Sequence, residues 1–151
     1  DMKRVYLIGH GNLEIKEFVD LLIKNNIKTL VDVRSIPYSK YNSQFNRENL
    51  EYELSEVGIE YKHLENKLGG KIPEDFEKYI KSEEFNEGLN VLKEIIISSN
   101  SAIMCAEIDY NKCHRKFIAL RLNEAGFEVL AIGKNGIIQK VTQKTLTDIF
   151  Q

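Results

Sequence analysis

Two short stretches decide the fold class of this chain: residues 5–11 read VYLIGHG and residues 29–34 read TLVDVR. Each is an apolar run that ends in glycine or charged residues, which is typical of a buried strand followed by a turn. Between them, apolar side chains recur at the spacing of one helix face, at Ile15, Phe18, Val19 and Leu22. This order predicts a right-handed βαβ unit with parallel strands.

The same alternation continues along the chain. Further apolar runs predict strands at 59–61, 102–105 and 128–132, and a sixth at 136–139 that pairs antiparallel with the fifth. Helical spacing predicts helices near 47–57, 85–96 and 118–125, and a last one from residue 142. We therefore expect an α/β fold, a single three-layer domain over residues 2–151. Its sheet would be mostly parallel, with about five strands and helices on both faces.

Residues with side-chain or backbone preferences for helix ends mark several boundaries. Asn12 and Asn46 are positioned to cap the first two helices. Asn25-Asn26 is expected to end the first helix, and Gly58 to end the second.

The composition excludes several classes of protein. The chain is 42% hydrophobic and 29% charged with a net charge of −2, so we expect no global attraction to nucleic acid or membranes. Its apolar runs are far shorter than the ~20 residues that cross a bilayer. With no recognisable signal peptide and two cysteines, we expect a cytoplasmic protein with free thiols.

Three polar segments follow predicted strands: 9–11, 32–35 and 105–115. In an open parallel sheet, ligands bind beyond the carboxyl ends of the strands. If the strands are parallel, the three segments meet at one edge and form one site. The loop over 34–46 is longer than a connection needs, which indicates a working surface.

The third segment has the most chemistry. Cys113-His114-Arg115 is expected to start a helix, where backbone N–H groups favour an anion and lower a thiol pKa. Cys105 or Cys113 is a candidate nucleophile, and Glu107 or His114 a candidate for proton transfer. Arg115 is a candidate anion ligand. The alternatives are that Cys105 is a packed strand residue and that Glu107 is an ordinary solvated carboxylate.

The other two segments supply candidate substrate-binding residues. Alternation places Asp32 and Arg34 on the same side of their strand, where they face a ligand together or form a salt bridge that holds the loop. His10, between two glycines, contacts a ligand or is an ordinary turn residue. Ser39 adds a hydroxyl group on the long loop. The Gly69-Gly70 pair is expected to be a turn.

The motifs of metal and nucleotide sites are absent from the sequence. The spacing of Cys105, Cys113 and His114 lacks the short pairs of structural zinc sites, and we assign no metal ligand. There is no Walker motif, and Gly9-His10-Gly11 lacks the third glycine of a dinucleotide fingerprint. The sequence therefore names no cofactor.

Taken together, the polar motifs resemble a known family. They are Ile8-Gly9-His10, Asp32-Val33-Arg34-Ser35-x-Pro37-x-Ser39, Phe45 with Leu50, Gly58-Ile59-x-Tyr61, Leu68-Gly69-Gly70, and Met104-Cys105-Ala106-Glu107 with Cys113-His114-Arg115. In this order, from residue 5 to about 132, they resemble the domain-of-unknown-function 488 family. The resemblance implies a small cytoplasmic α/β domain with a functionally important cysteine motif and no settled activity.

The chain departs from the pattern of this family at two places. Gly11 replaces the usual hydroxyl residue after Gly-His, and the segment between Gly70 and Phe85 contains no Trp. These departures put in doubt a hydroxyl contact at position 11 and a stacking role for the second segment.

The residues support three functional hypotheses. The first is an enzyme, a cysteine-dependent transferase or hydrolase, that acts on an anionic substrate such as a phosphate ester, a nucleotide or nucleic acid. A rhodanese-like sulfur transfer is a minor branch of it. The second is a non-catalytic nucleotide- or nucleic-acid-binding module with a basic-aromatic surface, made of Arg34, Lys40, Arg47, Arg115, Lys116, Tyr38, Tyr41 and Phe45. The third is a metal-dependent hydrolase or a metal-binding domain, and the oligomeric state stays open in all three.

Overall fold

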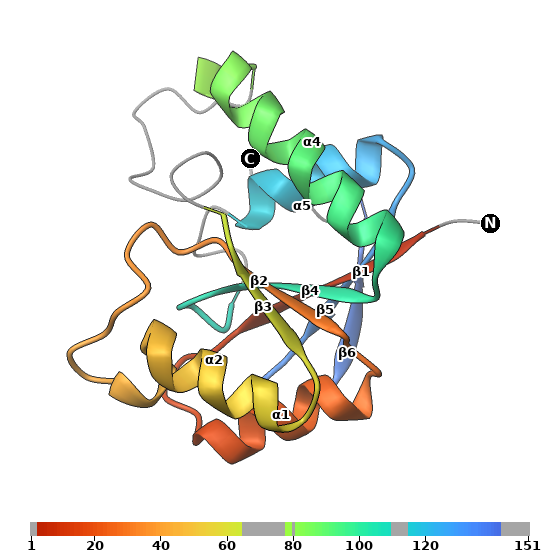
Figure 1. The fold of residues 1–151 in the computed structure, drawn as a ribbon. Coiled ribbons are helices and arrows are strands. Elements are labelled where there is room, and N and C mark those ends of the chain that lie inside the picture. The colour runs from red at the N-terminus through yellow and green to blue at the C-terminus, as the bar shows by residue number, and fades with distance from the viewer. Residues whose placement is uncertain (1–2, 65–77, 80, 110–114, 143–151) are drawn as a thin grey trace.

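One six-stranded sheet forms the centre of the computed structural model, which describes residues 3–64, 78–79, 81–109 and 115–142 (Figure 1). The predicted Gly69-Gly70 turn and the helix expected after Thr142 lie outside these residues. The strands are β1 (Arg4–Gly9), β2 (Thr29–Asp32), β3 (Glu60–His63), β4 (Ser101–Cys105), β5 (Glu128–Ile132) and β6 (Ile138–Val141).

Helices cover both faces of this sheet. In the described part of the chain they are α1 (Ile15–Lys24), α2 (Arg47–Glu56), α4 (Glu83–Ser98) and α5 (Arg115–Glu124), with a 3-10 turn η1 (Ser43–Phe45) before α2. Figure 1 shows α1 and α2 on one side of the sheet and α4 and α5 on the other. The predicted three-layer α/β fold is confirmed.

Alternation along β1 shows how the two layers are built. Val5 and Leu7 are buried against the residues of α4 and α5, whereas Tyr6 and Ile8 are buried against those of α1 and α2. Successive side chains of a strand point to opposite faces, so a strand covered on both faces must be apolar throughout. This is why β1, β2 and β4 read as continuous apolar runs.

The strand order is β3-β2-β4-β1-β5-β6, and all pairs are parallel except β5 with β6. The strands β1 and β2 of the predicted βαβ unit are therefore not neighbours, because β4 lies between them. The sheet has six strands rather than about five. The sixth pairs antiparallel with β5 as predicted but begins at Ile138, because a hydrogen-bonded turn occupies Gly133 to Ile137.

Neither of the two asparagines that were expected to cap a helix does so with its side chain. Asn12 does not cap α1, since the N-cap is Glu14 and makes no side-chain cap. A turn closed by the bond from the Leu13 N–H to the His10 carbonyl delays the helix. Asn46 does occupy the N-cap of α2, but its side-chain oxygen accepts a hydrogen bond from the Ser39 N–H instead. Gly58, at φ +75°, follows the C-cap of α2 as predicted.

The end of β1 must be glycine because the chain after β4 passes directly over it. A Cβ added at Gly9 would lie 1.8 Å from the Glu107 carbonyl oxygen and 2.6 Å from the Ile108 Cα. Both are backbone atoms, so no side-chain rotation relieves the overlap. Gly9 thereby allows the ends of β1 and β4 to approach.

We expect Gly9→Ala to lower the free energy of unfolding by ~3 kcal/mol or more, the upper range for overpacking. Urea denaturation measures it. Gly133→Ala is the matched control, because its Cβ would meet only one carbonyl oxygen at 3.3 Å. Equal, small losses in the two variants would contradict the close approach at Gly9.

Candidate functional site

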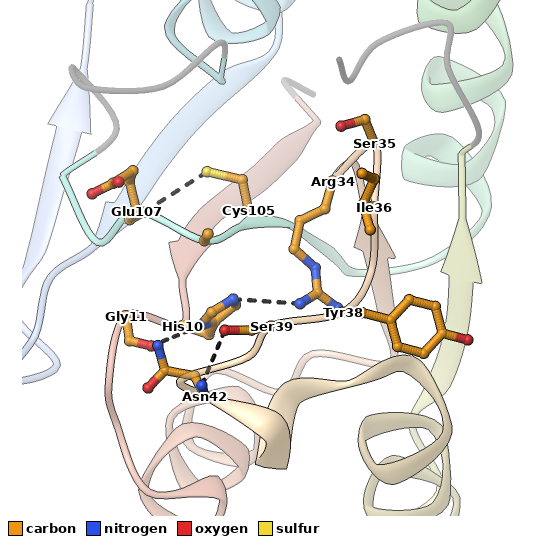
Figure 2. Close-up of a pocket in the computed structure, with 11 residues that line it drawn as sticks. His10, Gly11, Arg34, Ser35, Ile36, Tyr38, Ser39, Asn42, Cys105 and Glu107 are labelled. Atoms are coloured by element: carbon orange, nitrogen blue, oxygen red, sulfur yellow. Dashed lines mark hydrogen bonds between the residues drawn. The ribbon is translucent and has the colours of Figure 1, made fainter. Parts of the chain in front are cut away.

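A pocket of about 540 Å³ lies at the carboxyl edge of the sheet, where β1, β2 and β4 end (Figure 2). All three segments singled out in the sequence contribute to it. Its lining residues are His10, Gly11, Arg34, Ser35, Ile36, Tyr38, Ser39, Asn42, Cys105, Ala106 and Glu107. The expectation that these distant segments meet at one edge is confirmed.

The parallel register explains why they meet. Gly9 lies opposite Cys105 and Asp32 lies opposite Met104, so β1, β2 and β4 end at nearly the same level. The His10 N–H then bonds to the Cys105 carbonyl at 3.1 Å, and the Gly11 N–H to the Ala106 carbonyl at 2.8 Å. The pocket is therefore a direct consequence of strand direction and register.

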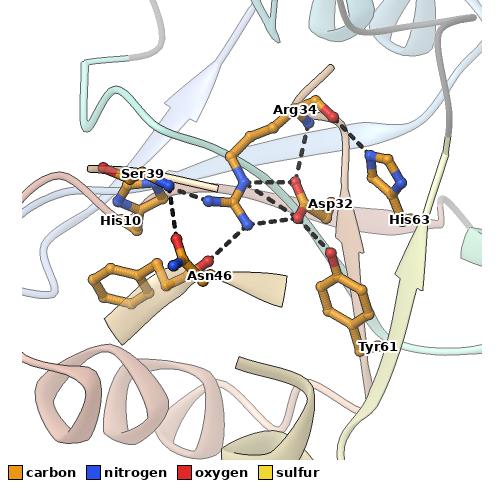
Figure 3. A network of polar contacts seen from close by, with 8 residues as sticks. His10, Asp32, Arg34, Ser39, Asn46, Tyr61 and His63 are labelled. Atoms are coloured by element: carbon orange, nitrogen blue, oxygen red, sulfur yellow. Dashed lines mark hydrogen bonds and ion pairs between the residues drawn. The ribbon is translucent and has the colours of Figure 1, made fainter. Parts of the chain in front are cut away.

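The floor of the pocket rests on a buried ion pair between Asp32 and Arg34 (Figure 3). Arg34 Nη2 donates to Asp32 Oδ2 at 2.8 Å, and Arg34 Nε donates to Asp32 Oδ1 at 3.0 Å. The exposed fractions of the two residues are 0% for Asp32 and 6% for Arg34. Nη2 also donates to the Phe45 carbonyl at 2.8 Å, which fastens the long loop to the ion pair. The salt bridge considered from the sequence is present.

This arrangement leaves Nη1 as the guanidinium nitrogen that neither Asp32 nor the Phe45 carbonyl engages. Its hydrogen-bond partner in the described part of the chain is His10 Nε2, at 3.4 Å. His10 Nδ1 lies 2.8 Å from the Gly11 carbonyl, so Nδ1 carries the proton and Nε2 presents a lone pair. Nη1 and the imidazole of His10 are thus held side by side.

His10 is fixed and kept neutral. Its ring stacks on Phe45 with centroids 4.5 Å apart, and its exposed fraction is 2%. Burial lowers the pKa of His10 below the usual 6.5, and the positive charge of Arg34 lowers it further, while the Gly11 carbonyl opposes the shift. At neutral pH the site therefore holds a neutral imidazole, a better proton acceptor than donor at Nε2.

Two residues of β3, Tyr61 and His63, support the ion pair and were not assigned to the site from the sequence. The Tyr61 hydroxyl donates to Asp32 Oδ2 at 2.5 Å, and burial together with the Asp32 carboxylate raises the pKa of Tyr61. His63 Nε2 donates to the Arg34 carbonyl at 2.7 Å, and His63 Nδ1 is buried with no hydrogen-bond partner among the described residues. Tyr61 belongs to one of the family motifs, so the sequence did contain a signal that this residue matters.

The opposite wall comes from the segment after β4. Cys105 is 3% exposed, packs in the core on the α4 and α5 side and also lines the pocket. Its thiol donates to the Glu107 carbonyl at 3.8 Å. Arg115 is 1% exposed and donates to the carbonyls of Glu107 and Ile108. Arg115 does not line the pocket. Its guanidinium instead holds this wall in place through these two carbonyl groups.

Ser39 and Asn42 complete the wall on the long loop. The Asn42 N–H donates to Ser39 Oγ at 3.0 Å, and both residues line the pocket.

Cys113 and His114, the remaining candidates, lie outside the described residues. Among the described residues, no group of three or more His, Cys, Asp or Glu side chains is placed to hold a metal ion, and no helix is long and apolar enough to cross a membrane.

The fold and pocket define an α/β protein with a polar cleft at the carboxyl ends of its parallel strands. The family described as Domain of unknown function DUF488 matches residues 14–122, and the chain belongs to this family. Comparison with curated proteins and with solved structures finds no match. The family resemblance predicted from the motifs is confirmed.

We expect Asp32→Asn to lower the free energy of unfolding by about 3–5 kcal/mol, because it leaves the buried Arg34 cation without its counter-charge. Tyr61→Phe removes one hydrogen bond and should cost less. Urea denaturation at pH 7 measures both variants. Glu128→Gln, which breaks an ion pair between Glu128 and the exposed Arg4, is the control and should change little. An Asp32→Asn protein as stable as the wild type would show that the ion pair does not stabilise the fold.

The lowered pKa of His10 predicts a pH dependence of stability. Below its usual pKa of 6.5, the unfolded chain takes up a proton at His10 before the folded chain does. Proton uptake therefore favours unfolding, and stability falls as the pH decreases from 6.5 through the folded pKa. Urea denaturation between pH 5 and 8 should show a shallower dependence for His10→Gln than for the wild type. Identical slopes would contradict the prediction.

Proposed function

We propose that the chain is an enzyme that acts on a small anionic, phosphate-bearing substrate in this pocket. The observation that carries the proposal is the meeting of four chemically distinct groups, from segments far apart in the sequence, around one cavity: the Arg34 guanidinium, the neutral imidazole of His10, the Cys105 thiol and Glu107. A cavity of about 540 Å³ is of the size that holds a small-molecule substrate.

The anion would bind at the arginine. Asp32 and the Phe45 carbonyl fix the guanidinium through Nε and Nη2, which leaves Nη1 to donate into the pocket. A charge-assisted hydrogen bond from a guanidinium to a phosphate is strong and directional. His10 and Ser39 would complete the substrate-binding side of the site.

The chemical step would use the opposite wall. In this proposal Cys105 supplies the sulfur nucleophile of a transferase or hydrolase, and Glu107 takes up and returns protons. On the basis of the sequence alone, Cys113 remains a candidate nucleophile and His114 a candidate for proton transfer. Cys105 is held by core packing on one side and borders the cavity on the other, which is the setting of a positioned nucleophile.

The placement of the residues favours this proposal over the binding-module alternative. That alternative needs an exposed basic-aromatic surface, but Arg34, Phe45 and Arg115 are buried. Lys40, Arg47 and Lys116 lie over the rings of Tyr41, Tyr61 and Phe117. The described residues therefore offer a polar pocket rather than a continuous basic strip.

Calorimetric titration with inorganic phosphate at pH 7 tests the anion site. We expect Arg34→Lys to weaken phosphate binding about tenfold or more, because a lysine ammonium lacks Nη1 and cannot make the paired hydrogen bonds to Asp32 that position it. Arg4→Gln, at the opposite end of β1, is the matched control and should bind as the wild type does. Circular dichroism verifies that both variants are folded. Failure of the wild type to bind phosphate or any simple phosphate ester would refute the proposal.

Alkylation with iodoacetamide across pH tests the nucleophile. Mass spectrometry of the two cysteine peptides follows Cys105 and Cys113 separately. An activated Cys105 should react with a midpoint below ~8.5, the value of an ordinary thiol, and phosphate should slow its reaction. The urea-unfolded protein gives the reference curve. A Cys105 that reacts only after unfolding is a packed core residue and not a nucleophile.

A further inference from the structure

The wall of the pocket next to Arg34 is apolar although it is open to solvent. Ile36 and Tyr38 both line the pocket, and their exposed fractions are 70% and 51%. Figure 2 shows them on one side of Arg34, with Cys105 and Glu107 on the other. A cavity with an anion-binding donor at its floor thus has an uncovered apolar side.

Tyr38 is held in position by a residue outside the pocket. Its hydroxyl donates to Glu48 Oε1 on α2 at 2.5 Å. This bond raises the pKa of Tyr38 and lowers the pKa of Glu48. Since the hydroxyl is engaged by Glu48, Tyr38 contributes its ring to the cavity. An aromatic ring that lines a cavity is suited to stacking against a flat ligand group.

The pocket also contains a polar group able to form hydrogen bonds with the edge of a flat ligand ring. Asn42 lines the same pocket on the His10 side of Arg34 (Figure 2), and its side-chain amide offers two donor hydrogens and an acceptor oxygen. Among the described residues this amide makes no hydrogen bond that would occupy these positions. The pocket therefore combines an anion donor, an apolar face and an amide.

We infer that the ligand of this pocket is a nucleoside monophosphate, with its phosphate at Arg34 and its base against Ile36 and Tyr38. The inference rests on the proposed function, because it uses the same cavity and the same guanidinium. The volume of about 540 Å³ suits one nucleotide. The net charge of −2 argues against a polymeric nucleic acid, which a basic surface would have to attract.

The test compares ligands with and without a base. The 5′-monophosphates of adenosine, guanosine, cytidine and uridine are titrated into the full chain by calorimetry, beside ribose 5-phosphate. Base stacking should make at least one nucleotide bind roughly 5- to 100-fold more tightly than ribose 5-phosphate. Tyr38→Leu should remove most of this preference and leave ribose 5-phosphate binding unchanged. Tyr38→Phe, which keeps the ring but loses the bond to Glu48, should retain part of the preference.

Tyr52→Leu is the matched control, because Tyr52 is an exposed tyrosine of α2 that does not line the pocket. Equal binding of nucleotides and ribose 5-phosphate would overturn the base site and leave the anion site standing. Failure of both ligand types would overturn the proposed function as well. A single-stranded hexanucleotide that binds more tightly than every mononucleotide would overturn the mononucleotide assignment in favour of nucleic acid.

Discussion

The buried ion pair between Asp32 and Arg34 is the interaction on which the site depends. An unpaired charge at either position would be very costly in the protein interior, so each residue requires the other. The pair also holds the loop after β2, because the guanidinium donates to the Phe45 carbonyl and the Asp32 carboxylate accepts from the Arg34 N–H and from Tyr61. The network thereby fastens the loop at Arg34 and at Phe45, on either side of the other residues of this loop that line the pocket.

The pairing also bears on how the proposed anion would bind. Because Asp32 compensates the charge of Arg34, this guanidinium would not draw anions by charge alone. Binding at Nη1 would then rely on hydrogen-bond direction, and the neutral His10 beside it presents a lone pair rather than a second positive charge. Under the proposed function, such a site would favour ligands of the right shape over anions in general, and its apolar wall would add contacts for the rest of the substrate.

The wall opposite the long loop depends on a different constraint. The Glu107 carbonyl lies against Gly9, where no Cβ fits, and accepts a hydrogen bond from the buried Arg115. Backbone contact on one side and a charged donor on the other fix the path of the chain after β4. Cys105 and Glu107 therefore line the cavity on a segment that is braced from both sides, which suits the catalytic role proposed for them.

Local sequence patterns are enough to predict most of the strands and helices and the edge at which the pocket forms. Apolar runs such as VYLI and periodic positions such as Phe18 and Leu22 report local burial, and strand direction follows from the alternation of strands and helices. Long-range contacts set the remaining features: β4 lies between β1 and β2, the Asn46 side chain bonds to Ser39 instead of capping α2, and Arg115 braces a wall. They also bring Tyr61 and His63 to Asp32 and Arg34. Strand order and side-chain partners depend on contacts between segments far apart in the chain, and periodicity carries no information about which distant segment a residue will meet.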